Sequence, residues 1–130
     1  MTPLILIVDD EPQIQMLISA ILEEKGYKTE ICDSGEKALK MMEDIEFNLV
    51  LLDLNLPGLN GIEVSEKIKK NSPNTPIIFI TGLTTAEAMS LEAECKSKDD
   101  MELMYKPIDN NMLYSNIDKL INISLEKGKA

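Results

Sequence analysis

The sequence predicts an α/β fold, a doubly wound parallel sheet of five strands with five helices on its two faces. Five short apolar runs alternate with five segments of helical periodicity, which is the pattern of repeated strand–helix units. Three of the runs are uninterrupted, as expected of strands covered on both faces. A chain of 130 residues can bury a substantial core, and we expect one domain, 1–130.

The first strand is expected at 4–8, an entirely aliphatic run. Pro12 then stands where the first turn of a helix tolerates proline, and Gly26 is a suitable residue to end that helix. Residues 27–32 alternate in polarity and predict a second strand with one wetter face. The apolar side chains at helical spacing between these strands are Ile14, Leu17, Ile18, Ile21 and Leu22.

Ser34 is expected to cap the second helix, which ends near the aliphatic run of the third strand at 49–53. Asn60 and Glu63 have the spacing of a capping box and predict the start of the third helix. The side chains expected to face inward from these two helices are Ala38, Leu39, Met42, Ile45, Val64 and Ile68.

The fourth strand is expected at 77–80, ending in Thr81 and Gly82. Thr84, three residues before Glu87, predicts a second capping box and a helix to about Cys95. A fifth strand is expected at 101–105, and Asp109 is expected to cap the last helix. The inward side chains of that helix are Leu113, Ile117, Leu120 and Ile121.

Charges within the strands predict their order in the sheet. The strands at 4–8, 49–53 and 77–80 are uninterrupted apolar runs up to their last residue, which is typical of interior strands. The strands at 27–32 and 101–105 carry charged residues in their middle, which suits the edges. Both features agree with the order 2-1-3-4-5 of the flavodoxin-like fold.

Polar residues end four of the five strands. Asp9 and Asp10 follow the first strand, Asp53 ends the third, Thr81 the fourth, and Lys106 follows the fifth. The carboxyl ends of parallel strands open on one edge of the sheet, so these side chains are expected to meet there.

Three carboxylates at one edge repel one another, since a pair at ~4 Å costs roughly 4 kcal/mol at an effective dielectric near 20. Lys106 supplies one positive charge, and a divalent cation is implied. An all-oxygen ligand set suits Mg²⁺. A carboxylate nucleophile, an ammonium, a hydroxyl and a metal ion are the parts needed to accept a phosphoryl group.

With these residues the chain resembles the receiver domain of two-component response regulators, in the form of a chemotaxis-regulator-like single domain. The resemblance covers essentially the whole sequence. Its motifs are Asp9-Asp10, Asp53, Leu56-Pro57-Gly58 with Gly61, Thr81 and Lys106-Pro107.

The resemblance implies that Asp53 receives a phosphoryl group from a sensor histidine kinase or a histidine phosphotransfer protein. It implies that Thr81 and Lys106 then contact the phosphoryl oxygens, and that the bond to Pro107 is cis, which proline alone makes cheap. The domain is expected to act as a signalling switch rather than as an enzyme.

The resemblance also implies a set of Mg²⁺ ligands. Asp10 and Asp53 would bind the ion through their carboxylates, Asp9 mainly through water, and Asn55 through its backbone carbonyl. The surface of the fourth helix, fifth strand and fifth helix would bind a downstream protein, in a monomer or a phosphorylation-dependent dimer. The family usually has an aromatic residue where this chain has Leu103, and Tyr105, on the same face of the strand, is its candidate replacement.

Composition excludes several classes of protein. The net charge of −10 argues against nucleic acid as a direct partner. Without histidine, and with two cysteines at no metal-ligand spacing, a zinc site is not expected, and Cys32 and Cys95 are interpreted as small buried hydrophobes. There is no run long enough to span a membrane and no signal peptide pattern, so we expect a cytoplasmic protein.

Alternative interpretations of the same residues remain open. Asp10 could be only the N-cap of the first helix, with Gln13 completing a box, and Asn55 only a turn residue. A flavin mononucleotide binder shares the predicted fold, but the acidic first loop would repel its phosphate. An aspartyl-nucleophile phosphatase of the haloacid dehalogenase type needs a second acid where this chain has Asn55. A pseudo-receiver that binds partners without phosphorylation is the remaining alternative.

Overall fold

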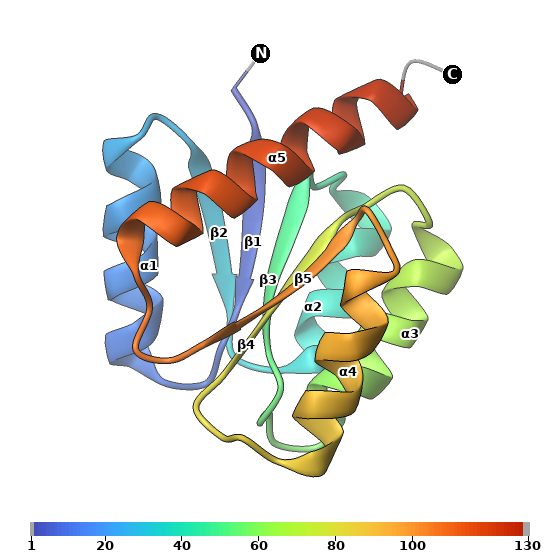
Figure 1. Ribbon diagram of the computed structural model, residues 1–130. Coiled ribbons are helices and arrows are strands. Elements are labelled where there is room, and N and C mark those ends of the chain that lie inside the picture. Colours follow the sequence, from blue (N-terminus) through green and yellow to red (C-terminus); the bar gives the residue numbers. More distant parts are fainter. Residues whose placement is uncertain (1, 129–130) are drawn as a thin grey trace.

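The computed structural model describes residues 2–128 and confirms the predicted architecture (Figure 1). The strands are β1 (Leu4–Val8), β2 (Lys28–Cys32), β3 (Leu49–Asp53), β4 (Ile77–Thr81) and β5 (Met101–Tyr105). The helices are α1 (Pro12–Glu24), α2 (Gly35–Asp44), α3 (Gly61–Asn71), α4 (Ala86–Lys96) and α5 (Asn110–Gly128). All strand pairs are parallel, and the sheet has the order β2-β1-β3-β4-β5, as predicted.

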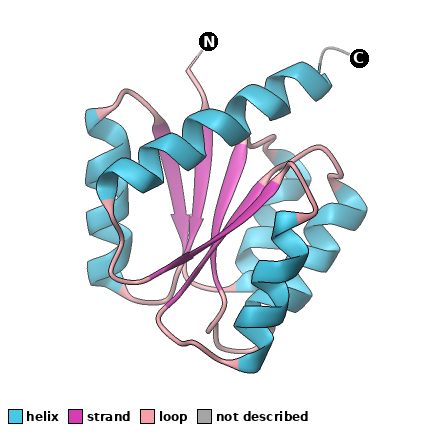
Figure 2. Cartoon of the chain, in the orientation of Figure 1, coloured by secondary structure: helices cyan, strands magenta, loops and turns pink. Residues whose placement is uncertain are grey.

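Helices cover both faces of the sheet (Figure 2). On one face α2, α3 and α4 pack against side chains such as Val50 and Phe79. On the other face α1 and α5 pack against Leu51 and Ile78. Phe79 has no exposed surface, and burying a side chain of this size stabilises the fold by about 1.5–3 kcal/mol. Among the helices of residues 2–128, none is both long and apolar enough to cross a membrane.

Three of the predicted helix caps are confirmed. The side chains of Ser34, Asn60 and Asp109 accept hydrogen bonds from the backbone N–H groups of Lys37, Glu63 and Met112, at 3.2, 3.0 and 3.0 Å. Each bond satisfies an N–H group that the first turn of a helix leaves without a partner. Cys32 and Cys95 are both buried free thiols, as predicted.

One predicted cap is wrong, and the alternative interpretation of Asp10 as a helix cap does not hold. Thr85, not Thr84, caps α4, because it is the Thr85 hydroxyl that accepts the hydrogen bond of the Ala88 N–H group, at 3.1 Å. The N-cap residue of α1 is Glu11 rather than Asp10, and its side chain makes no capping hydrogen bond.

The predicted inward face of α1 is too wide. Leu17 is 50% exposed, whereas Ile18, Ile21 and Leu22 are buried. The helix presents a narrow apolar stripe to the sheet, and Leu17 lies beside it. The second strand also begins one residue later than predicted, at Lys28.

Candidate functional site

Asp53 lies at the carboxyl end of the central strand, where its side chain is 3% exposed. Its Oδ1 atom accepts a hydrogen bond from the backbone N–H of Asn55, at 3.0 Å. The loop behind it is tight, since a Cβ atom at Gly61 would lie 2.5 Å from the Asp53 carbonyl oxygen. Strand pairing and this loop therefore hold the carboxylate in one place.

Lys106 follows β5 and reaches back toward the acidic residues. Its backbone N–H donates to the carbonyl of Thr81 at 2.8 Å, which fixes the ends of β4 and β5 together. Its Nζ atom lies 3.2 Å from Glu11 Oε1, 3.6 Å from Asp53 Oδ2 and 3.7 Å from Asp9 Oδ2. Burial opposes the charged form of this ammonium, but the charges of Asp53, Asp9 and Glu11 outweigh burial and raise the pKa of Lys106.

The two acids after β1 differ in exposure, since Asp9 is buried and Asp10 is exposed. Asp9 Oδ1 accepts a hydrogen bond from the Glu11 N–H group at 2.8 Å. Burial is the main cause that raises the pKa of Asp9 to about 6; the charge of Asp53 adds to the rise, and the Glu11 N–H group and Lys106 act against it. Negative charge is therefore crowded here.

Four carboxylates meet at this edge of the sheet. Asp9, Asp10, Glu11 and Asp53 each offer an oxygen atom, and these oxygens lie within 4.8 Å of one another. The donor set is all oxygen and strongly negative, which fits the preference of Mg²⁺. Glu11 is not among the predicted site residues; its position directly after the acidic pair is the one signal for it in the sequence, but an acid at the start of a helix is common without any function.

The structure also brings Thr81 and Asn55 to this edge, where both line a cavity of about 400 Å³. Thr81 is buried, and its hydroxyl accepts a hydrogen bond from the Leu83 N–H group at 3.1 Å. This hydroxyl is thus engaged with its own loop. The bond between Lys106 and Pro107 is cis, as the resemblance implies.

Leu103 and Tyr105 lie on the same face of β5, as predicted, where both pack against the core beneath α2, α3 and α4. Partial desolvation and the nearby Glu92 carboxylate of α4 raise the pKa of Tyr105. The Tyr105 hydroxyl therefore lies near α4.

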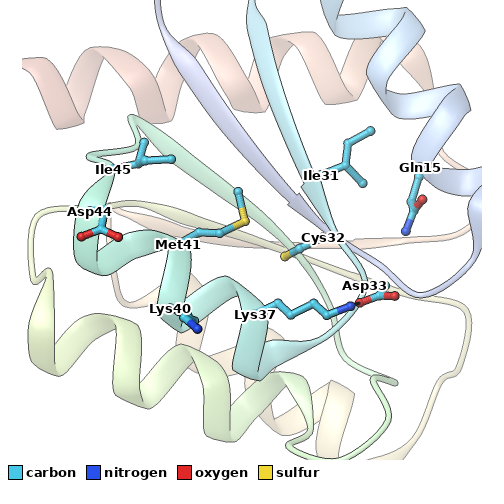
Figure 3. A pocket seen from close by; sticks show the side chains of 9 residues that line it. All are labelled: Gln15, Ile31, Cys32, Asp33, Lys37, Lys40, Met41, Asp44 and Ile45. Atoms are coloured by element: carbon cyan, nitrogen blue, oxygen red, sulfur yellow. Dashed lines mark ion pairs between the residues drawn. The ribbon is translucent and has the colours of Figure 1, made fainter.

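A larger groove, of about 570 Å³, lies beside β2 and α2 (Figure 3). Its lining residues are Gln15, Ile31, Cys32, Asp33, Lys37, Lys40, Met41, Asp44 and Ile45. An ion pair of 2.8 Å joins Lys37 to Asp33. None of the predicted site residues lines this groove. The groove is therefore not the predicted site, although it is larger than the cavity beside Thr81 and Asn55.

The fold and the site define a class of protein. An open parallel sheet in this strand order, with aspartates after β1 and β3 and a lysine after β5, is the arrangement of signalling receiver domains. The comparison with protein families agrees, because the family model for the response regulator receiver domain matches residues 5–118. The chain belongs to this family.

Similar proteins were found among solved structures. A CheY-like receiver domain protein from Methanospirillum hungatei has a TM-score of 0.86 and 30% identity, with 98% of this chain and 99% of that chain covered. The response regulator TrrA from Thermotoga maritima, solved in complex with Mg²⁺ and BeF, has a TM-score of 0.79 and 33% identity, with 92% of this chain and 99% of that chain covered.

Among curated proteins, the DNA-binding response regulator MtrA of Mycolicibacterium smegmatis is 34% identical over 103 residues. The match covers 79% of this chain and 45% of MtrA. The chain thus spans about half the length of the curated relatives that it matches.

Proposed function

We propose that residues 1–130 form a receiver domain that acts as a phosphorylation-dependent switch in a two-component phosphorelay. The proposal depends on one observation, the position of the Lys106 ammonium 3.6 Å from the buried Asp53 carboxylate in a cluster of acidic side chains. A fixed nucleophile beside a cation is what the acceptance of a phosphoryl group requires.

In the proposed reaction, a carboxylate oxygen of Asp53 attacks the phosphorus atom of a phosphohistidine on a sensor histidine kinase or a phosphotransfer protein. The new O–P bond forms while the P–N bond breaks. The electron pair of the broken P–N bond stays on the imidazole nitrogen, and the imidazole takes up a proton. Lys106 neutralises charge on the phosphoryl oxygens. The Thr81 hydroxyl leaves the Leu83 N–H group and donates to one of these oxygens.

Mg²⁺ is the proposed cofactor. Asp10 and Asp53 would hold it through their carboxylates, Asp9 through water, and Asn55 through its backbone carbonyl. When bound, the ion neutralises charge shared by the carboxylates and the phosphoryl oxygens. The crowding of four carboxylates supports this assignment, as does the Mg²⁺ in the structure of the Thermotoga relative.

The proposed output surface consists of α4, β5 and α5. Three large apolar side chains on or beside it are more than half exposed, namely Leu83, Met89 and Met112. A signal that moves the Thr81 loop would reach this surface first, because that loop leads into α4. The proposed partner is a protein, since a net charge of −10 does not favour nucleic acid.

The proposal is tested by incubating the protein with acetyl phosphate and Mg²⁺ and measuring its intact mass. We expect a gain of one phosphoryl group (roughly 80 Da), which adds close to two negative charges. The gain should be absent without Mg²⁺ and absent in Asp53→Asn. The matched control is Asp33→Asn, which removes an exposed carboxylate that is paired with Lys37 and is not part of the acidic cluster, and this variant should be phosphorylated normally.

Other outcomes would favour the alternatives. A wild-type protein that gains no mass, from acetyl phosphate or from a phosphorylated histidine kinase, would be a pseudo-receiver. Repeated turnover of p-nitrophenyl phosphate would indicate a phosphatase. The second of these is disfavoured by Asn55, which stands where such an enzyme needs its second acid.

A further inference from the structure

The shortest ion-pair contact of Lys106 is with a carboxylate to which the proposed reaction gives no role. Its Nζ atom is 3.2 Å from Glu11 Oε1, within hydrogen-bond distance, but 3.6 and 3.7 Å from Asp53 and Asp9. The side chain of Glu11 is 60% exposed, whereas those of Asp53 and Asp9 are 3% exposed. The ammonium thus leans toward the solvent side of the acidic cluster.

The backbone of Glu11 is held in place while its side chain is not. Its N–H group donates to Asp9 Oδ1 at 2.8 Å, and its carbonyl accepts from the Gln15 N–H group at 3.0 Å, in the first turn of α1. Its carboxylate makes no capping hydrogen bond. Instead it contacts a lysine 95 residues further along the chain.

We propose that Glu11 is a positioning residue that holds Lys106 at the mouth of the site until Asp53 is phosphorylated. This inference depends on the function proposed above. A phosphoryl group carries close to two negative charges, against one for the carboxylate that it modifies. Lys106 is therefore drawn inward, and its contact with Glu11 lengthens.

Exposure makes Glu11 suited to this role. An ion pair with an exposed carboxylate is weak, because water and salt screen it. The free-energy cost of separating Lys106 from Glu11 is therefore small. The ion pair nevertheless favours the position that Lys106 has in the unphosphorylated protein. Since a switch responds only to the difference in interactions between its two states, the strength of this contact shifts the balance between them.

The test compares the wild type with Glu11→Gln, which keeps the size of the side chain and removes its charge. Without metal, we expect the ¹Hε and ¹³Cε NMR resonances of Lys106 to shift in the variant, because its nearest carboxylate is gone. With Mg²⁺ and beryllofluoride, a mimic of the phosphoryl group, we expect the variant to bind about two to five times more tightly. Glu11→Asp, one methylene shorter, should be intermediate.

The matched control is Glu87→Gln. Glu87 is an exposed acid that lines the cavity of Asn55 and Thr81, so its removal changes the charge at the same edge without removing a carboxylate paired with Lys106. Equal tightening in both variants would indicate a general charge effect and overturn the role of Glu11. Unchanged Lys106 resonances in Glu11→Gln would also overturn it.

Failure of the proposed function has a different signature. A wild-type protein that does not bind beryllofluoride in the presence of Mg²⁺ would contradict the phosphoacceptor site. The resonances of Lys106 in the metal-free protein would still show whether Glu11 holds the ammonium. Binding by the wild type with unchanged affinity in Glu11→Gln would contradict the positioning role alone.

Discussion

The carboxyl group of Asp9 is buried in a site where negative charge exceeds positive charge. Its pKa rises from 3.8 to about 6, so the folded protein binds a proton at this position more strongly than the unfolded chain does. Protonation of Asp9 therefore adds to the free energy of unfolding. This contribution is fully present below about pH 4 and is lost as the pH rises from about 4 to about 6.

Replacing Asp9 by Asn should stabilise the metal-free protein. Asn cannot ionise, and its Oδ1 atom can keep the hydrogen bond from the Glu11 N–H group. At neutral pH we expect a gain of roughly 1–2 kcal/mol in the free energy of unfolding. This is less than the free energy that corresponds to the whole pKa shift of Asp9, because Lys106 loses a partner in the variant. Urea denaturation at several pH values measures this gain, which should shrink toward pH 4.

Asp33→Asn, at an exposed position, is the control for this measurement, and it should not reproduce the gain at neutral pH. A pH-independent difference between Asp9→Asn and the wild type would show that the Asp9 carboxyl group has no raised pKa.

At the scale of single residues, the positions of Asp9 and Asp53 could be predicted because each stands at the end of an apolar run, and that of Lys106 because it stands at the end of the fifth predicted strand, before Pro107. A charge directly after a buried run is uncommon, since charged side chains are almost never buried unless they are paired. Glu11 could not be assigned in the same way, since an acid at the start of a helix is common without any function. Its role depends on a contact with Lys106, which only the assembled sheet creates.

The loop between β3 and α3 is the element that fixes the orientation of the strand that ends in Asp53. It closes so tightly that a Cβ atom at Gly61 would lie 2.5 Å from the Asp53 carbonyl oxygen and 2.7 Å from Leu54 Cα. Both are backbone atoms, so no side-chain rotation can relieve the contact. The start of α3 and the end of β3 must separate if this position carries a side chain.

Gly61→Ala should therefore destabilise the fold, by about 1–3 kcal/mol for an overpacked position. It should also slow phosphorylation of Asp53, because the carboxylate shifts with its strand. Chemical denaturation and intact-mass time courses measure the two effects. Gly82→Ala is the control, since the nearest atom to its Cβ would be Lys106 Cδ at 3.8 Å, an ordinary contact; equal stability of the two variants would contradict the argument.

Element boundaries followed from the sequence wherever a cap had one candidate. Asn60 precedes a helix without another Ser, Thr, Asp or Asn beside it, and this prediction is confirmed. Thr84 and Thr85 are identical in type, and the spacing to Glu87 favours Thr84, but Thr85 is the residue that caps α4. Leu17 was misplaced because helical periodicity defines the apolar stripe but not how much of it the sheet covers.

For the whole molecule, ion binding should be coupled to folding. The acidic cluster brings the three acids that follow β1 together with Asp53 at the end of β3 only in the native sheet, so Mg²⁺ should bind the folded chain in preference to the unfolded one. At ten times its dissociation constant, the ion should stabilise the fold by about 1.4 kcal/mol. For a domain of this size that is a rise in Tm of roughly 4–8 °C.

Thermal unfolding followed by circular dichroism measures this rise. Sodium chloride at equal ionic strength is the control, because screening of a net charge of −10 also stabilises the fold. Asp10→Asn should lose the specific part of the effect. An equal response of this variant and the wild type to Mg²⁺ would place the ion elsewhere on the surface.

Lys106 follows the last strand, whereas its partners lie near the start of the chain and in its middle, and this order has a consequence for biosynthesis. Protein synthesis proceeds from the N-terminus, so the acidic side chains leave the ribosome well before the lysine that neutralises them. A nascent or prematurely terminated polypeptide that ends before Lys106 lacks the ammonium. Only a chain that has been synthesised past Lys106 and has folded brings the ammonium beside the Asp53 carboxylate.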